Sequence, residues 1–319
     1  MPFGTSSIVI QDPESGASAQ IKPDIGFNCF SFRPVINGKA VEVIQADSDF
    51  ADEGGSPTRN GIPLLFPFAG RIRNARYRYG GKDHHVTTAR PNGDNAIHGF
   101  VLDRRWRVTD YGANRVVGEF QGSIDGPETI ADWPSDYRIR ATYTVTGASF
   151  ISDFEISTPG KSPLPFSFGT HPYFKIPLSG GDPAQCRAVV PASERWTLVD
   201  LLPTGEHHPV DPEVDLRAGK SFPETTVDDV LSSLASENGI VTTIVEDAST
   251  DIRVTQTFPD HFRYCIVYTP VERNAIAIEP YTSLVDPFAM TDLGIDPELI
   301  VLAPGETWKT SITISAEGI

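Results

Sequence analysis

Two ionisable residues stand directly before prolines, each at the end of an apolar stretch. His171 lies in residues 165–174, which are rich in aromatic side chains and contain no Lys, Arg, Asp or Glu. Glu279 follows the apolar residues 275–278 and precedes Pro280. A following proline restricts the backbone to extended conformations, and apolar surroundings shift a side-chain pKa towards the neutral form. One interpretation is a general acid and a general base; the other is two buried side chains with a structural role.

Arg71 and His98 also combine a polar side chain with apolar neighbours. Arg71 lies in residues 61–72, a segment shaped by glycine and proline. Its guanidinium is either an ion-pair partner at a sheet edge or a donor aimed into a pocket. His98 precedes Gly99, and a glycine lets other backbone or a ligand approach closely. Taken alone, His98 is more simply interpreted as a structural histidine.

An acidic pair, Asp228 and Asp229, lies in residues 225–235. We expect these residues to form a short helix, the only one that the sequence suggests. Acidic residues at the start of a helix interact favourably with its dipole, so the pair has a structural interpretation as well as a functional one.

Alternation of apolar and polar residues with a period of two predicts strands along most of the chain. The clearest case is residues 137–145, and similar alternation occurs in residues 6–10, 150–156, 252–258, 262–268 and 308–315. Many strands without interleaved helices indicate an all-β fold of antiparallel sheets packed as a sandwich. No linker, repeat or charge block divides the chain, so we expect one domain over residues 1–319.

The composition is that of an ordinary globular protein with an acidic balance. Hydrophobic residues make up 39% and charged residues 21%, so a substantial core is expected. Lys and Arg number 26 against 42 Asp and Glu, which gives a formal net charge of −16. Such a chain repels phosphate backbones and anionic lipids. We therefore expect neither nucleic acid nor a membrane as a partner.

Cysteine usage and the first residues predict a cytoplasmic location. Cys29, Cys186 and Cys265 are odd in number and form no CxxC pair, which argues against a disulfide framework and a zinc site. The chain starts without a basic and apolar signal segment, and no apolar run is long enough to span a membrane.

Four segments, in order, resemble the signature motifs of the aldose 1-epimerases, also called galactose mutarotases. They are residues 61–72 (Gly-Ile-Pro-Leu-Leu-Phe-Pro-Phe-Ala-Gly-Arg-Ile), 95–100 (Asn-Ala-Ile-His-Gly-Phe), 170–174 (Thr-His-Pro-Tyr-Phe) and 278–282 (Ile-Glu-Pro-Tyr-Thr). The resemblance implies the large twisted antiparallel β-sandwich of that family, the galactose mutarotase-like supersandwich. It also implies a sugar substrate and no cofactor or metal.

The resemblance further implies roles for individual residues. His171 matches the general acid of the family and Glu279 its general base. Arg71 and His98 match positions that bind sugar hydroxyls.

Asp228 looks like the sugar-binding aspartate of the family, with one departure in its segment. Leu231 stands where the family usually has phenylalanine, and Asp229 lies next to the matching aspartate. The choice between the two aspartates stays open.

The implied reaction interconverts the α and β anomers of free aldohexoses. One group removes the proton of the anomeric hydroxyl while the other protonates the ring oxygen, and the opened chain rotates about C1–C2 and recloses. A histidine and a carboxylate in apolar surroundings suit these two roles. We expect Trp133 or Phe68 to stack on the apolar face of the sugar.

Two alternatives to this activity remain. An epimerase of hexose 6-phosphates would need a basic cluster at the phosphate, for which Arg73, Arg76 and Arg78 are candidates beside Arg71. A non-catalytic carbohydrate-binding or sugar-sensing protein would use the same fold without a matched acid and base. The acidic balance disfavours the first, and the paired acid and base disfavour the second. The sequence does not predict an oligomeric state.

Overall fold

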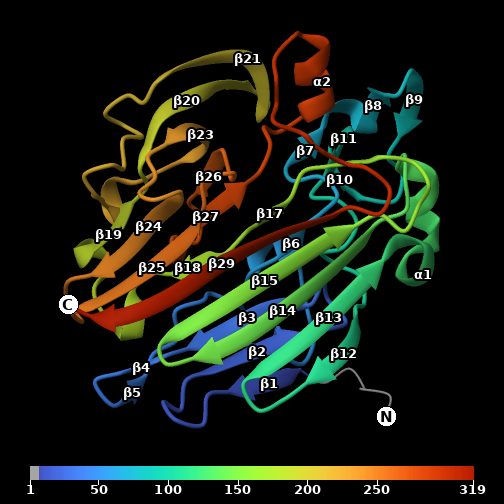
Figure 1. The fold of residues 1–319 in the computed structure, drawn as a ribbon. Helices are drawn as coiled ribbons and strands as arrows, with labels where there is room; N and C mark the ends of the chain where they lie inside the picture. Colours follow the sequence, from blue (N-terminus) through green and yellow to red (C-terminus); the bar gives the residue numbers. More distant parts are fainter. Residues whose placement is uncertain (1–6) are drawn as a thin grey trace.

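The computed structural model describes residues 7–319, and β-strands provide most of its regular structure (Figure 1). The pairings that build its two large sheets are antiparallel. This confirms the predicted all-β class. That residues 1–319 form one domain stays a prediction.

The largest sheet crosses the front of the molecule in Figure 1. Its strands follow the order β12 (Arg107–Tyr111), β13 (Arg115–Gln121), β14 (Arg138–Thr146), β15 (Ser149–Ser157), β29 (Thr307–Gly318), β25 (Ile252–Pro259), β24 (Ile240–Asp247), β19 (Cys186–Val189) and β22 (Lys220–Ser221). Buried residues alternate with more accessible ones along β14 and β25. One face of this sheet therefore packs on the core and the other faces solvent.

The second large sheet carries most of the candidate site. Its order is β21 (Leu202–Pro209), β20 (Ala192–Val199), β23 (Asp228–Leu234), β26 (Tyr264–Tyr268), β27 (Ala275–Tyr281), β17 (Gly169–Thr170) and β6 (Leu64–Leu65), and β18 (Tyr173–Lys175) also pairs with β27. Every residue of β27 is buried. This explains why the strand reads as a continuous apolar run that Glu279 interrupts.

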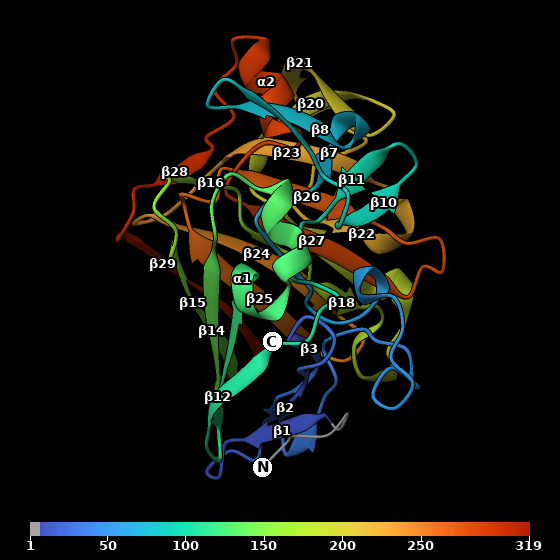
Figure 2. The same ribbon diagram turned by 90° about the vertical axis from the view of Figure 1, so that its right-hand side faces the viewer.

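Short ribbons and turns complete the fold (Figure 2). The ribbons are β1 (Ile8–Gln11), β2 (Ser18–Lys22) and β3 (Asn28–Arg33); β7 (Arg71–Ile72), β10 (Arg90–Asn92) and β11 (Asn95–Ile97); β4 (Val35–Ile36) and β5 (Lys39–Ala40); β8 (Arg76–Tyr79) and β9 (Lys82–His85); and β16 (Leu164–Phe166) and β28 (Ile300–Leu302). The helices are α1 (Gly122–Asp125) and α2 (Pro287–Asp292), and 3₁₀ turns occur at Pro57–Arg59, Arg73–Ala75, Pro127–Asp132, Leu178–Gly180, Pro183–Gln185 and Phe222–Glu224. Within residues 7–319, no helix has the length and apolar character needed to cross a membrane.

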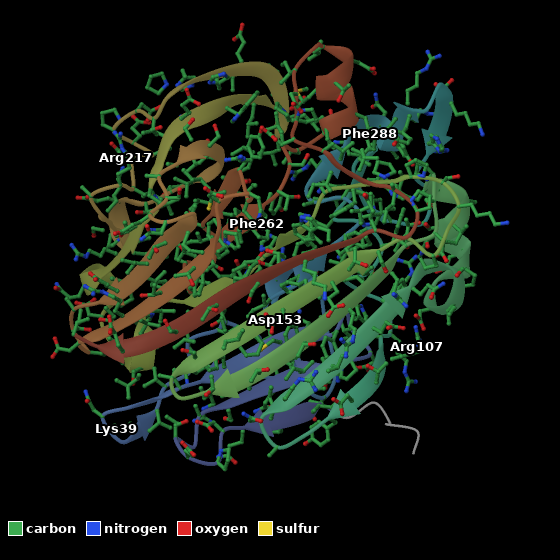
Figure 3. The ribbon with its side chains drawn as sticks, in the orientation of Figure 1. Lys39, Arg107, Asp153, Arg217, Phe262 and Phe288 are labelled. Carbon is green, nitrogen blue, oxygen red and sulfur yellow. The ribbon has the colours of Figure 1, made fainter. Side chains whose placement is uncertain are left out.

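Aromatic side chains fill the interior between the sheets. The ring centroids of Phe66 and Phe166 lie 5.6 Å apart, and those of Phe154 and Phe168 lie 4.8 Å apart. Figure 3 shows charged residues such as Asp153 on the outside of the fold. Burial of each large apolar side chain contributes about 1.5–3 kcal/mol, so this interior is a main source of the stability that holds the sheets together.

Most of the strands that alternation predicts are present. Of the predicted strand at 137–145, residues 138–145 fall in β14, and residues 150–156 fall in β15. Residues 252–258 and 308–315 fall in β25 and β29. Of the predicted strand at 262–268, residues 264–268 form β26. The predicted strand at 6–10 corresponds to β1, although Ser6 lies outside the described residues.

The predicted helix at residues 225–235 is wrong, because residues 228–234 form β23. This strand pairs with β20 on one side and with β26 on the other. The apolar residues Val227, Val230, Leu231 and Leu234 have helical spacing. A strand buried on both faces also produces such a run, so the spacing did not distinguish the two structures.

Candidate active site

The register of three strands brings the predicted acid and base together. On β27, the residue two positions after Glu279 pairs with Gly169 of β17, and the residue two positions before it pairs with Tyr173 of β18. His171 lies halfway between these pairings and therefore faces Glu279. Its Nε2 lies 3.1 Å from Oε1 of Glu279, and the two side chains are 8% and 2% exposed.

A tyrosine holds each member of this pair. The hydroxyl of Tyr281 donates a hydrogen bond of 2.8 Å to Oε2 of Glu279. The ring of Tyr173 stacks on the imidazole of His171 with centroids 4.7 Å apart, and its hydroxyl donates to the carbonyl oxygen of Thr58 at 2.6 Å. The orientations of both side chains are therefore fixed by their neighbours rather than by solvent.

Burial disfavours a charge on either group. It lowers the pKa of His171 to about 3 and raises the pKa of Glu279 well above its usual 4.5. One proton shared between Nε2 and Oε1 leaves the pair without net charge. A buried pair that shares a proton across 3.1 Å is suited to proton transfer.

His98 lies beside this pair in an unusual backbone conformation. Its φ is +64°, and its imidazole packs edge-on against that of His171 with centroids 5.6 Å apart. Burial lowers the pKa of His98, so the ring is neutral at physiological pH. Nδ1 of both histidines is buried and has no hydrogen-bond partner within residues 7–319. A ligand in the pocket could satisfy these nitrogens.

The guanidinium of Arg71 is oriented by a neighbouring hairpin. Arg71 lies in β7, which pairs with β11, and β11 in turn pairs with β10. Nε of Arg71 donates a hydrogen bond of 2.9 Å to Oδ1 of Asn92, at the end of β10. Of the two interpretations of Arg71, the geometry therefore favours a donor aimed into a pocket.

The two aspartates at the start of β23 have different surroundings. Arg195 donates to Asp229 at 2.7 Å, so this carboxylate is already engaged in an ion pair. The carboxylate of Asp228, an exposed residue at the start of the strand, makes no hydrogen bond or ion pair within the described part of the chain, and partial desolvation raises its pKa. Asp228 is therefore the member of the pair whose carboxylate is available to a ligand.

All five predicted residues line one pocket of about 320 Å³: Arg71, His98, His171, Asp228 and Glu279. This volume falls in the range of small-molecule sites. The same pocket is lined by residues that the sequence analysis did not assign to a site: Thr58, Arg59, Asn92, Tyr173, Leu198, Leu201, Tyr268 and Tyr281. Tyr281 lies two residues after Glu279, so strand periodicity could have placed it on the same face. No comparable signal exists for Asn92, because nothing in the sequence shows which strand its hairpin joins.

The prediction that Trp133 or Phe68 stacks on a sugar is wrong. Both side chains are buried and stack on each other with centroids 5.6 Å apart, and neither lines the pocket. The aromatic walls of the pocket are tyrosines instead, among them Tyr173 and Tyr268. Trp133 donates its indole N–H to the carbonyl oxygen of Pro165, which ties it to the core.

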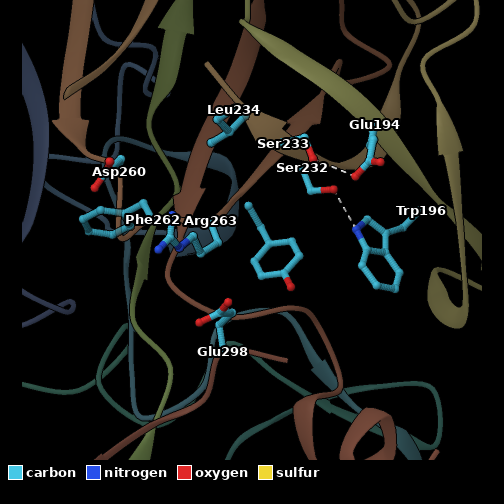
Figure 4. Close-up of a pocket in the computed structure, with 10 residues that line it drawn as sticks. Glu194, Trp196, Ser232, Ser233, Leu234, Asp260, Phe262, Arg263 and Glu298 are labelled. Atoms are coloured by element: carbon cyan, nitrogen blue, oxygen red, sulfur yellow. Dashed lines mark hydrogen bonds between the residues drawn. The ribbon is translucent and has the colours of Figure 1, made fainter. Parts of the chain in front are cut away.

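A second pocket of about 310 Å³ lies nearby on the same sheet (Figure 4). Trp196 donates to Ser232 at 3.0 Å, and Ser233 donates to Glu194 at 2.7 Å. Glu194 at this pocket lies 3.5 Å from Nδ1 of His207, but these two side chains are 34% and 46% exposed, unlike the buried pair of His171 and Glu279. None of the five predicted residues lines this second pocket. The pocket at His171 is therefore the candidate active site.

Comparisons with known proteins agree with this assignment. Residues 35–315 match the family model of the aldose 1-epimerases. Over 146 residues the chain is 27% identical to galactose mutarotase of Mus musculus, a match that covers 45% of this chain and 41% of the relative. The chain thus spans less than half the length of that relative.

Solved structures with similar folds confirm the predicted galactose mutarotase-like sandwich. A galactose mutarotase-like protein from Clostridium acetobutylicum has a TM-score of 0.84 at 22% identity, over 96% of this chain and 94% of that chain. An aldose epimerase homologue from C. elegans has a TM-score of 0.80 at 20% identity, over 98% and 99%. Because the family model covers most of its length, the chain belongs to the aldose 1-epimerase family.

Proposed function

We propose that the protein is an aldose 1-epimerase that interconverts the α and β anomers of free aldohexoses. Its family is one of mutarotase-like sugar epimerases. The observation that carries the proposal is the contact of 3.1 Å between Nε2 of His171 and Oε1 of Glu279 in a pocket of ligand size. The anomeric oxygen and the ring oxygen are both bonded to C1, so a catalytic acid and a catalytic base that act on them must be neighbours in the pocket.

In the proposed mechanism, Glu279 takes the proton of the anomeric hydroxyl while His171 gives a proton to the ring oxygen. The C1–O5 bond breaks, and C1 becomes an aldehyde carbon. After rotation about C1–C2, the C5 hydroxyl returns its proton to His171 and attacks the other face of C1, while Glu279 protonates the carbonyl oxygen. Both groups end as they began, so the reaction consumes no proton and no electron.

Arg71, His98 and Asp228 would hold the sugar hydroxyls. The guanidinium donates, the carboxylate accepts, and the neutral imidazole can do either. Arg71 is already oriented by Asn92. The free carboxylate of Asp228 and the unpartnered Nδ1 of His98 supply further polar groups within residues 7–319. Such groups orient a ring in the pocket so that C1 faces the acid and the base.

The surroundings of the arginines support a free aldose rather than a hexose 6-phosphate. Arg73 forms an ion pair of 3.1 Å with Asp286 and does not line the pocket. Arg76 and Arg78 are exposed on β8, outside the pocket. The basic cluster that a phosphate would require is therefore not assembled from these residues.

Polarimetry tests the proposal directly. The rotation of freshly dissolved α-D-glucose, α-D-galactose or arabinose should decay faster with the parent protein than in buffer alone. Glu279→Gln should remove most of this acceleration, whereas Glu206→Gln, an exposed control with the same chemical change, should not. A parent protein that binds these sugars but leaves the decay at the buffer rate would instead be a carbohydrate-binding protein.

A further inference from the structure

We propose that Tyr281 is a positioning residue for Glu279: its hydroxyl holds Oε2 of the carboxylate, so that Oε1 is the atom presented to the substrate. The inference rests on the proposed role of Glu279 as the base.

The two carboxylate oxygens of Glu279 have different partners. Oε2 accepts the hydrogen bond of 2.8 Å from Tyr281, and Oε1 contacts Nε2 of His171 at 3.1 Å. Rotation of the carboxylate about its last bond would exchange these oxygens. The hydrogen bond opposes this rotation and leaves the oxygen beside the general acid as the one that meets the anomeric hydroxyl.

The ring of Tyr281 is itself fixed by its packing. Tyr281 is buried in a cluster that includes Leu65, Ala69 and Val285. Gly169 faces it across the strand pairing, and a Cβ added there would lie 2.6 Å from Cδ1 of the ring. Glycine at position 169 therefore leaves room for the ring, and the packing around it keeps the hydroxyl at Glu279.

The same hydrogen bond opposes the effect of burial on Glu279. Burial favours the neutral acid, whereas a hydroxyl that donates to the carboxylate favours the ionised form. The other titratable or charged groups near Glu279, from the elements packed against it, are Arg71, His171, Tyr173, Asp228, Cys265 and Tyr268. Removal of the Tyr281 hydroxyl alone should therefore raise the pH at which the carboxylate ionises.

Tyr281→Phe is the test, because it keeps the ring and removes the hydroxyl. The active pair holds one proton, which it loses at the high-pH limb of kcat/KM for mutarotation. This high-pH limb should move upwards by about one pH unit, and kcat at the optimum should fall by about tenfold. A residue with only a packing role would change activity without moving this limb. The matched control is Tyr111→Phe, which removes an exposed hydroxyl bound to the carbonyl oxygen of Val9, does not line the pocket and should leave the limb in place.

A second variant and a second measurement keep the test independent of folding and of catalysis. Gly169→Ala should displace the ring of Tyr281 while its hydroxyl is retained, and it should move the limb in the same direction. Carbon-13 NMR of protein with labelled glutamate carboxyls should show a higher titration midpoint for Glu279 in Tyr281→Phe, with the signal identified by its loss in Glu279→Gln.

The outcomes separate the two proposals. Unchanged limbs and midpoints in both variants would overturn the positioning role even in an active enzyme. The parent protein could also lack mutarotase activity while the NMR midpoint of Glu279 is higher in Tyr281→Phe than in the parent. That result would support the effect of the hydrogen bond on Glu279 and reject the proposed function.

Discussion

Two residues that the sequence already paired, His171 and Glu279, are in direct contact in the structure. Their separation in sequence gives no hint of this distance. It arises because β17 and β18 pair with β27 on either side of the contact. Neutral His98 and the carboxylate of Asp228, which is unpaired within residues 7–319, line the same pocket. The residues proposed as acid and base are therefore distinct from those proposed to bind hydroxyls.

The distinction predicts different kinetic effects for the two kinds of group. His171→Asn and Glu279→Gln should each lower kcat by about 10²–10⁴-fold, because they act on protons that move only in the transition state. Arg71→Ala and Asp228→Ala should mainly raise KM, since the proposed role of these two side chains is to hold hydroxyls in the ground state as well. Steady-state polarimetry with His85→Asn as an exposed control measures both effects. Near-parent kcat in His171→Asn would show that another group protonates the ring oxygen.

The burial of Glu279 also predicts how stability depends on pH. Burial raises its pKa above 4.5 in the folded state, so at higher pH the folded protein retains a proton that the unfolded chain has released. This contribution to stability is fully present below pH 4.5 and is lost as the pH rises through the folded-state pKa. The Glu279→Gln variant has no titrating carboxyl at this position, so this dependence of its stability on pH is absent. Its free energy of unfolding relative to the parent should therefore rise with pH, by up to about 1.4 kcal/mol per unit.

Urea unfolding of parent and variant at pH 5, 6 and 7 provides the measurement. The relevant quantity is the difference between the two proteins, because other groups titrate equally in both. Parallel stability curves over this range would mean that the pKa of Glu279 is not raised.

At the scale of elements, the loop that carries His98 depends on a close backbone approach. Gly99 has a φ of +75°, and an added Cβ would lie 2.1 Å from the carbonyl oxygen of Phe66. That oxygen accepts a hydrogen bond from the N–H of Phe100 at 2.8 Å. A side chain at position 99 would thus strain the backbone at this positive φ. It would also push the loop that carries His98 away from the carbonyl oxygen of Phe66.

Gly99→Ala should therefore destabilise the protein by about 3–5 kcal/mol and raise KM. The matched control is Gly93→Ala, in the turn between β10 and β11. Gly93 also has a positive φ, +61°, but nothing lies within 4 Å of its added Cβ. Its substitution should cost only about 1–2 kcal/mol. Equal losses in urea unfolding would show that backbone strain alone, and not the approach to Phe66, requires Gly99.

Sequence periodicity predicted the strands that have one solvent-exposed face, but it missed β23, a strand that is largely buried on both faces. β14 alternates, so it could be recognised, and its partner β15 likewise. β23 is buried along most of its length, and its apolar spacing fitted a helix as well as a strand. The error affected the interpretation of Asp228 and Asp229. As neighbours on a strand they point to opposite faces, one into the pocket and one to Arg195.

For the whole molecule, the motifs predicted which residues meet, but not how the chain brings them together. β29 at the end of the chain lies between β15 and β25 in the largest sheet (Figure 1). β27 lies inside the second sheet, where β26 directly precedes it in the chain but β17 and β18 come from a distant part of the sequence. Local alternation contains no information about such long-range pairings. The position of Tyr268 at the pocket and the hairpin that orients Arg71 depend on such pairings and were therefore missed, whereas Tyr281 could have been placed from strand periodicity.

The charge of the whole molecule predicts a preference for uncharged substrates. The net charge is −16, and the carboxylate of Asp228 lines the pocket without an ion-pair partner within residues 7–319. A dianionic phosphate on C6 therefore meets repulsion on its approach to the protein. We expect kcat/KM for glucose to exceed that for glucose 6-phosphate by about tenfold or more, or roughly 1.4 kcal/mol.

Ionic strength distinguishes this electrostatic cause from simple lack of space. Added salt shortens the range of the repulsion, so kcat/KM for glucose 6-phosphate should rise with salt while that for uncharged glucose stays constant. A steric barrier would leave both values unchanged. A preference for the 6-phosphate that weakens in Arg73→Ala or Arg76→Ala would contradict the prediction and would show that these arginines turn towards the pocket when a phosphate binds.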